Sequence, residues 1–262
     1  MARPAHLEPS KLGTREYWDE LYTTELANHA HDPADTGTAW FDDSDAEAKL
    51  IEFLEESERA GEFGLDVRNT SFLDLGTGNG ALLFALRDNG WEGAMLGVDY
   101  SALSVRFARR IERARRDVHF AEHDILHSPA TALLDERYAP SIRRGWDVVL
   151  DKGTFDAISL SAETIRDDAD ADTRRVNEVY GTRILPLVRE GGLFLITSCN
   201  WTEAELRSWF GAAREILPND GEGNGYWGFE VVGRVEYRSF SFGGVKGQTI
   251  SSLCFRKVRR GG

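Results

Sequence analysis

The sequence is poor in the features that mark membrane proteins, disulfide-stapled secreted proteins and nucleic-acid-binding proteins. Its two cysteines are too few for a disulfide framework, and both lie in apolar, strand-like segments, so we expect reduced thiols. No apolar run reaches membrane-spanning length, and the first ten residues contain no apolar signal core. Basic residues are outnumbered, with 31 lysines and arginines against 44 acids and a net charge of −13. These absences predict a cytoplasmic or nuclear protein without a membrane partner.

The acidic balance disfavours nonspecific nucleic-acid binding and favours a basic partner, although solubility alone would also explain it. A run of arginines has no aromatic platform between its members, so we interpret it as a solvated helix face rather than a nucleic-acid site. These arginines are Arg106, Arg109, Arg110, Arg113, Arg115 and Arg116. His119, His123 and His127 are spaced by four, but they belong to a strand and a loop, so no metal site is expected.

Strand-like and helix-like segments alternate along most of the chain, which predicts a parallel sheet with helices on both faces. An N-terminal helical segment, about residues 11–60, is expected to pack on the core. Ser44-x-x-Glu47 and Thr202-x-x-Glu205 look like capping boxes that open helices. Another helix is expected over 173–189. Buried strands are expected at 72–75, 94–98, 118–121, 146–150 and 193–197, and irregular surface loops at 128–144, 167–172 and 218–228.

The segment 72–83 indicates a buried strand, a glycine turn and an amphipathic helix. Glycines let the backbone approach a ligand and place amide donors and the positive end of a helix dipole beside it. The pattern Gly76-x-Gly78-x-x-Ala81 also satisfies the dinucleotide fingerprint, in which the helix start meets a pyrophosphate. Asp74 would then stand near a phosphate of the same sign, whereas it suits a ligand that carries an ammonium and a sulfonium. The turn therefore favours S-adenosylmethionine over a dinucleotide.

The C-terminal end departs from the alternation. Residues 229–242 and 249–255 are two β-rich runs joined by the glycine-rich segment 243–247, which leaves no room for a crossover helix. We expect a hairpin whose last strand runs antiparallel to its neighbour. The result is the α/β, Rossmann-like, seven-stranded sheet typical of methyltransferases. A dinucleotide enzyme would instead continue with another parallel half.

Acids follow each of the first four predicted strands, at the edge of an open parallel sheet where ligands bind. Asp99, after the second strand, is placed to accept hydrogen bonds from both ribose hydroxyls. Asp124 and Ile125 follow the third strand, where the acid can accept from the adenine amino group and the aliphatic side chain can cover the ring. A helix cap would explain any one acid, but Asp74, Asp99, Asp124 and Asp151 together predict one cofactor site.

The segment after the fourth strand, Asp151-Lys152-Gly153-Thr154-Phe155-Asp156, indicates the class of substrate. Methyltransferases that act on base amines or glutamine amides usually have an Asn-Pro-Pro-Tyr type motif here, which holds a planar nitrogen. A carboxylate beside an aromatic ring suits an aliphatic amine, because both stabilise a cation next to the reacting carbon. We predict Asp151 and Phe155 as catalytic residues of an amine pocket, with Asp156 and Trp201 as further candidates.

Several motifs together resemble one known family. They are LGTREYWD at 12–19, WF at 40–41, the glycine turn at 73–80, GVDYS at 97–101, DKGTFDAISL at 151–160, FLITSCNWT at 194–202 and SFGG at 241–244. The family is the eukaryotic protein-lysine methyltransferases that modify translation elongation factor 1-alpha, and the likeness runs from about Leu12 to Lys257. DKGTFDAISL and SCNWT are its specific motifs. The chain departs from the family at Thr38, where an acid is usual.

The resemblance implies methyl transfer from S-adenosylmethionine to the ε-amine of a lysine on that elongation factor, with S-adenosylhomocysteine as the product. We expect a single class I methyltransferase domain over residues 1–262, acting as a monomer on a basic protein. Trp40 is expected to cover the cofactor, and Tyr17 and Trp18 to close over it, with core packing as the other interpretation of Trp40, Trp18 and Trp201. The expected cofactor-binding residues are Trp40, Asp74, Gly76, Gly78, Asp99, Tyr100, Asp124, Ile125 and Asp151.

Three other functions are compatible with parts of the sequence. A methyltransferase of the same fold could act on another protein or on a small amine. A noncatalytic S-adenosylmethionine-binding module would keep the fold without turnover, but a decayed site would be expected to lose at least one of the four acids. An NAD-type dehydrogenase is disfavoured by Asp74 and by the terminal hairpin.

Overall fold

The computed structural model describes residues 3–112, 117–139, 142, 144–166, 173–216, 225–238, 240–242, 245–247 and 249–261. The helices are α1 Arg15–His31, α2 Ala46–Arg59, α3 Ala81–Asp88, α4 Ala102–Glu112, α5 Thr154–Ser159, α6 Val176–Ile184 and α7 Glu203–Gly211. The strands of the main sheet are β1 Phe72–Leu75, β2 Met95–Asp99, β3 His119–Glu122, β4 Trp146–Lys152, β7 Val188–Ser198, β8 Arg214–Ile216, β9 Tyr226–Val235 and β12 Ser251–Arg260. Two small hairpins pair β5 Thr164–Arg166 with β6 Thr173–Arg175, and β10 Phe240–Phe242 with β11 Val245–Gly247.

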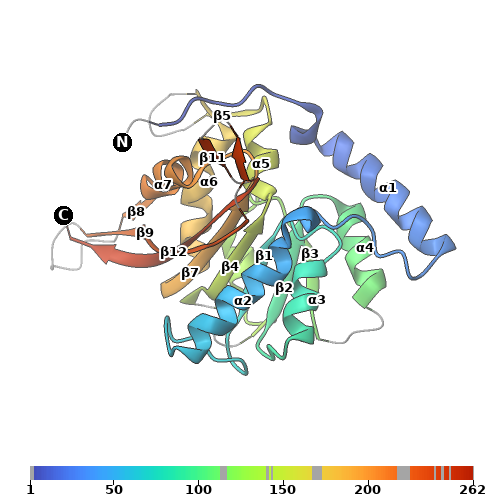
Figure 1. Cartoon of the computed structure of the whole chain (residues 1–262), viewed down its shortest axis with the longest axis horizontal. Helices are drawn as coiled ribbons and strands as arrows, with labels where there is room; N and C mark the ends of the chain where they lie inside the picture. Colours follow the sequence, from blue (N-terminus) through green and yellow to red (C-terminus); the bar gives the residue numbers. More distant parts are fainter. Residues whose placement is uncertain are drawn as a thin grey trace.

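The strands of the main sheet lie in the order β3-β2-β1-β4-β7-β12-β9-β8 (Figure 1). Strands β3, β2, β1, β4 and β7 pair in parallel, whereas β12 runs antiparallel to both β7 and β9. The predicted mostly parallel sheet with an antiparallel C-terminal strand is confirmed. The described residues add an eighth strand, because the short edge strand β8 pairs with β9.

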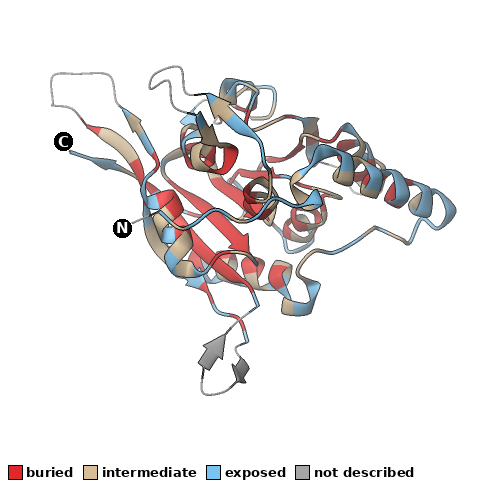
Figure 2. Ribbon diagram, turned by 90° about the horizontal axis from the view of Figure 1, so that it is seen from above, coloured by how far each residue is buried: buried red, intermediate tan, exposed pale blue. Residues whose placement is uncertain are grey.

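Helices cover both faces of the sheet (Figure 1). Apolar side chains of α2, α3 and α4 form one buried cluster with the sheet, and those of α6 and α7 form another with its opposite face. Figure 2 shows the buried residues concentrated in the central strands and the exposed residues along the outer side of α1. Helix α1 packs against α4, and Tyr22 and Leu26 of α1 enclose Phe107 of α4. This contact places the N-terminal helix beside the carboxyl ends of β1 and β2.

Some local predictions are corrected by the structure. Ser44 caps no helix, because Asp42–Ser44 form a 3-10 turn and α2 begins at Ala46. The capping box at Thr202 and Glu205 is confirmed at the start of α7. The helix expected over 173–189 is shorter, since residues 173–175 form β6 and Val188 opens β7. The first strand of the C-terminal hairpin, expected over 229–242, ends at Val235 as β9. Residues 240–242 and 245–247 form the separate pair β10 and β11.

Of the three segments predicted as surface loops, the structure describes mainly the first. Within 128–144, Leu133 and Ile142 are buried, and the indole of Trp146 donates to the Leu133 carbonyl at 2.9 Å. This segment therefore contributes to the core. Residues 167–172 and 217–224 lie outside the described residues, as do Arg113, Arg115 and Arg116. Among the described helices, none is long and apolar enough to cross a bilayer.

Candidate active site

A cavity of about 460 Å³ lies at the carboxyl ends of β1, β2, β3 and β4. Every residue predicted to bind the cofactor lines this cavity except Asp151. The lining ones are Trp40, Asp74, Gly76, Gly78, Asp99, Tyr100, Asp124 and Ile125. The parallel arrangement of the strands brings these residues together, as their positions after successive strands predicted.

The glycine turn forms the floor of the cavity at positions where no side chain fits. Gly76 has a φ of +63°, and a Cβ there would lie 2.1 Å from the hydroxyl oxygen of Thr154. Gly78 has a φ of +58°, and a Cβ there would lie 2.9 Å from the hydroxyl of Tyr22. Both conformations are left-handed, which favours glycine. The turn is thus held between α1 and the start of α5, with its backbone facing the cavity.

Asp74 is almost fully buried at the end of β1 and lines the cavity. Its Oδ2 accepts a hydrogen bond from the hydroxyl of Thr77 at 2.7 Å. Burial raises the pKa of Asp74 to about 7, while the Thr77 hydroxyl and the ammonium of Lys152 act in the opposite direction. A carboxylate that is hard to ionise without a cation nearby is suited to bind a cationic ligand.

Asp99 is buried at the end of β2 and is oriented by two backbone donors. Its Oδ2 accepts from the amide of Gly78 at 3.2 Å, and its Oδ1 accepts from the amide of Ser101 at 2.9 Å. Burial raises the pKa of Asp99, while these amides oppose the shift. A carboxylate has about four acceptor positions, so each oxygen can still accept one hydroxyl hydrogen.

Asp124 caps the turn after β3 and stands at the rim of the cavity. Its Oδ1 accepts from the amides of Leu126 and His127, and its Oδ2 lies 3.6 Å from the guanidinium of Arg15. Arg15 also stacks over the ring of Tyr100 at 4.5 Å. Ile125, the next residue, also lines the cavity. An apolar side chain beside a hydrogen-bond acceptor can cover a purine ring while the acceptor binds its amino group.

The N-terminal segment supplies one wall of the cavity. Trp18 and Trp40 both line it, and their rings lie 5.4 Å apart, whereas Tyr17 packs on Trp18 without lining the cavity. Sequence reasoning missed Glu25, a buried acid of α1 that also lines the cavity. Its Oε1 accepts from both the amide and the hydroxyl of Thr38, at 3.2 and 2.6 Å. Glu25 therefore places a carboxylate next to Thr38, the position where the family pattern has an acid.

The structure does not bring Asp151 and Phe155 to the cavity, which corrects their prediction as the amine pocket. The carboxylate of Asp151 accepts from the amides of Thr154 and Phe155 and from the hydroxyl of Tyr180 at 2.7 Å. Phe155 is fully buried in an aromatic cluster with Tyr180 and Phe210. The strand expected over 146–150 continues to Lys152, so Asp151 lies within β4 rather than after it. The spacing of the motif could not show that α5 begins at Thr154 and turns both side chains into the core.

We expect Asp151→Ala to act on stability more than on the cofactor. The substitution leaves the Tyr180 hydroxyl and two helix amides without their acceptor, so the free energy of unfolding should fall by about 2–4 kcal/mol. Chemical denaturation at pH 7 measures this loss. Tyr180→Phe removes one hydrogen bond and keeps the helix cap, so it should lower the free energy of unfolding by only about 1 kcal/mol. Equal losses in the two variants would contradict this account.

Asp156, Cys199 and Asn200 line the cavity at the end of β4 and β7. Asp156 accepts from the hydroxyl of Ser198 and from the amide of Cys199 at 2.8 Å. Burial raises the pKa of Asp156, and burial together with Asp156 raises the pKa of the Cys199 thiol to about 12. The thiol therefore stays neutral. Cys199 is exposed, so the cavity reaches the surface here. Trp201 packs in the core instead.

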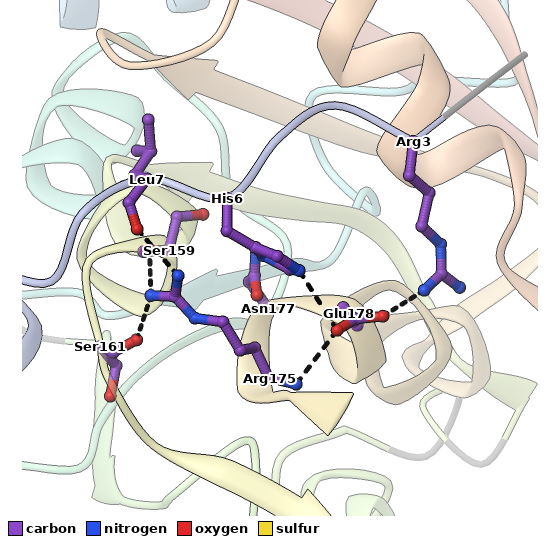
Figure 3. Close-up of polar contacts among 8 residues, drawn as sticks. All are labelled: Arg3, His6, Leu7, Ser159, Ser161, Arg175, Asn177 and Glu178. Carbon is purple, nitrogen blue, oxygen red and sulfur yellow. Dashed lines mark hydrogen bonds and ion pairs between the residues drawn. The ribbon is translucent and has the colours of Figure 1, made fainter. Parts of the chain in front are cut away.

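Residues 3–10, the N-terminal strap, run along α6 and α7 and lead into the cavity wall at Leu12 and Gly13. Figure 3 shows the guanidinium of Arg175 joining the carbonyl of Leu7 in the strap to those of Ser159 and Ser161 at the end of α5. Glu178 faces Arg3 and His6 of the strap (Figure 3). Because Ser161 lines the cavity, this network ties the strap to the cavity wall.

We expect Arg175→Ala to loosen both the strap and the wall beside it. Loss of three carbonyl contacts from one guanidinium should lower the free energy of unfolding by about 1–3 kcal/mol and weaken cofactor binding. Lysine cannot reproduce the planar arrangement of donors, so Arg175→Lys should recover only part of the loss. Arg207→Ala on the exposed side of α7 is the control. Calorimetric titration and proteolysis of the strap measure the two effects, and an unchanged strap in Arg175→Ala would contradict the account.

The residues present fit the expected cofactor. The glycine turn lines the cavity without side chains, the buried carboxylates of Asp74 and Asp99 keep free acceptor positions, and Ile125 adds an apolar side chain to the lining. No group of three His, Cys, Asp or Glu side chains in the described part of the chain could hold a metal ion.

Residues 66–232 match a family of methyltransferase domains. Protein-lysine N-methyltransferase EFM4 of Saccharomyces cerevisiae is 39% identical over 260 residues, which cover 98% of this chain and 99% of that protein. EEF1A lysine methyltransferase 2 of Danio rerio is 33% identical over 252 residues, which cover 95% of this chain and 89% of that protein. The human protein of the same name is 31% identical and is covered to 88%.

Among solved structures, magnesium protoporphyrin IX methyltransferase from Synechocystis PCC 6803 with bound SAM superposes with a TM-score of 0.53. The match covers 92% of this chain and 94% of that one at 13% identity, so the likeness concerns the fold alone.

Proposed function

The chain belongs to the protein-lysine methyltransferases that act on elongation factor 1-alpha, and from this premise we propose how its own residues methylate a lysine of that factor with S-adenosylmethionine. One observation carries the assignment of roles. A single cavity joins the acids after β1, β2 and β3 to Cys199 and Asn200 of the SCNWT motif, where it reaches the surface.

The acids divide the binding of the cofactor between them. Asp74 holds the cationic amino-acid end, Asp99 accepts from the ribose hydroxyls, and Asp124 with Ile125 holds the adenine. Trp40 covers the cofactor from the N-terminal side. These assignments follow from the charge and the free acceptor positions of each side chain at the cavity wall.

S-adenosylmethionine supplies a methyl group on a positively charged sulfur. The lone pair of the lysine nitrogen forms the new bond to the methyl carbon, and the sulfur leaves with the electron pair of the broken carbon–sulfur bond as a neutral thioether. The chain must present that nitrogen without its extra proton, although a free lysine has a pKa of about 10.4. Desolvation among Phe41, Asn200 and the neutral Cys199 thiol lowers that pKa, and the proton leaves to water at the exposed mouth beside Cys199. Positioning of the amine then supplies much of the rate.

The N-terminal helical segment and the sheet both line the cavity, so we propose that the chain works as one domain.

Purified elongation factor 1-alpha, incubated with the enzyme and labelled S-adenosylmethionine, tests the proposal. We expect label on one lysine-containing peptide, identified by mass spectrometry, and none on a panel of small amines. Label on small amines, or on other proteins but not on the factor, would favour a different substrate. Cofactor binding without any transfer would favour a noncatalytic module.

A further inference from the structure

Lys152, the second residue of the DKGTF motif, lines the cavity and has no role in the assignments above. Its side chain is 13% exposed, although a lysine is usually found in solvent. The ammonium donates a hydrogen bond to the carbonyl of Trp40 at 3.2 Å and lies 3.3 Å from Oε1 of Glu47. One cation at the end of β4 thus contacts both the N-terminal segment and α2.

Glu47 depends on this contact. It stands in the first turn of α2 and lines the cavity, and its Oε1 is buried without a hydrogen-bond partner among the described residues. The Lys152 ammonium lies within ion-pair distance of that oxygen. Removal of the ammonium would leave this buried carboxylate oxygen with neither a hydrogen bond nor an opposite charge from the part of the chain that the structure describes, which is strongly unfavourable.

Residues 36–41, the covering segment, cross the cavity between α1 and α2 and are held at three points. Asn79 of the glycine turn donates to the Thr36 carbonyl at 2.9 Å. Glu25 of α1 accepts from Thr38, and Lys152 donates to Trp40. Lys152 is therefore the anchor nearest to the tryptophan that lines the cavity.

The ring of Phe41 adds a tight fit at the same anchor. A Cβ on Gly153 would lie 3.1 Å from that ring, and the Lys152 ammonium is 6.0 Å from its centroid. Phe41 itself has a φ of +66°, a conformation that a non-glycine residue keeps only where surrounding contacts enforce it. The Phe41 carbonyl accepts from the amides of Ser44 and Ala46, both at 3.2 Å, and the Lys152 ammonium holds the carbonyl of the preceding residue, Trp40.

We propose that Lys152 is a positioning residue for methyl transfer, whose ammonium fastens the covering segment over the cofactor and, paired with Glu47, balances the charge around Asp74. This inference rests on the proposed function, because the fastened segment matters only if the cofactor lies beneath it.

The electrostatics of Asp74 give the inference a signature that loss of packing would not produce. Four groups face this carboxyl besides its own burial: the Thr77 hydroxyl, Lys152, Glu47 and Asp99. Lys152 lowers the pKa of Asp74, whereas Glu47 and Asp99 raise it. Removal of the Lys152 charge should therefore raise the pKa of Asp74, whereas removal of the Glu47 charge should lower it.

The test compares Lys152→Met and Glu47→Gln with the wild type, with S-adenosylhomocysteine as the calorimetric probe between pH 6 and 7.5. We expect Lys152→Met to weaken binding by about threefold to tenfold, because a rise in the pKa of Asp74 lowers its ionised fraction by at most a factor of ten per pKa unit. The pH midpoint of S-adenosylhomocysteine binding should move to higher pH in Lys152→Met and to lower pH in Glu47→Gln. Lys49→Met on α2, which removes a surface lysine paired with Glu52, should change neither.

Amide hydrogen exchange in the free protein supplies a second readout. Exchange in residues 36–41 should be faster in Lys152→Met than in the wild type, and Lys152→Arg, which keeps the charge, should restore part of the protection. Unchanged exchange together with an unchanged pH midpoint in Lys152→Met would overturn the inference. If Lys152→Met does not fold, the direction of the Glu47→Gln shift and the exchange of Lys152→Arg decide the matter. A wild type that binds no S-adenosylhomocysteine would overturn the proposed function, while exchange would still report whether Lys152 fastens the segment.

Discussion

Gly76→Ala should strongly weaken cofactor binding. The new Cβ would lie 2.1 Å from the Thr154 hydroxyl oxygen, at a residue whose φ is +63°. Left-handed strain of about 1–2 kcal/mol and overpacking of about 1–3 kcal/mol then act together on the turn that forms the cavity floor. We expect the affinity for S-adenosylmethionine, measured by calorimetry, to fall by at least about tenfold.

Gly90→Ala is a control that introduces left-handed backbone strain without a steric clash. Gly90 has a φ of +89°, but a Cβ there would meet no atom within 4 Å, and the residue lies away from the cavity. This variant should lose stability without losing affinity. Addition of Thr154→Ala to Gly76→Ala removes the clashing hydroxyl and should restore part of the binding. Normal affinity in Gly76→Ala would show that the turn is not the cofactor cradle.

Asp74→Asn should remove most of the affinity for the cofactor while the fold is kept. The amide oxygen can still accept from Thr77, so the substitution chiefly removes the negative charge. A hydrogen bond to a charged group contributes about 1.5–3 kcal/mol, so we expect S-adenosylmethionine to bind about 10- to 100-fold more weakly. Asp66→Asn, at an exposed carboxylate that accepts from backbone amides, is the matched control.

The pH dependence of binding gives the same prediction an independent check. The pKa of Asp74 is raised to about 7, so its carboxylate is ionised above that pH and protonated below it. Wild-type affinity should therefore decrease as the pH falls from 7.5 to 6, a range in which an α-ammonium with a pKa of about 7.7 or higher stays mostly charged. Asp74→Asn should lack this dependence. A wild-type affinity that does not change with pH would argue against Asp74 as the cation site.

The fold was largely predictable because alternation and turn chemistry are local signals. The glycine turn, the acids at strand ends and the terminal hairpin each identify an element and its direction, and they place Asp74, Asp99 and Asp124 at one edge. The start of α2 was mispredicted, because tertiary contacts of Ser44 with Thr249 outweigh its capping pattern.

The side of the cavity proposed to take the lysine amine was less predictable, because the direction of its side chains depends on where the short helix α5 begins. Asp151 and Asp156 belong to the same motif, yet only Asp156 lines the cavity. The first amides of α5 and the Tyr180 hydroxyl hold the carboxylate of Asp151 inward, and these contacts have no sequence signal. The motifs DKGTFDAISL and SCNWT already contain Lys152, Cys199 and Asn200. Their presence at the site could have been inferred from these motifs, but their contacts could not.

A crystal structure of the complex with S-adenosylhomocysteine tests the central claim most directly. We predict the ribose on Asp99, the adenine beside Ile125, the amino group near Asp74 and the sulfur facing the side lined by Asp156 and Asn200. A ligand bound elsewhere on the chain, or one in this cavity that contacts none of the three acids, would contradict the account.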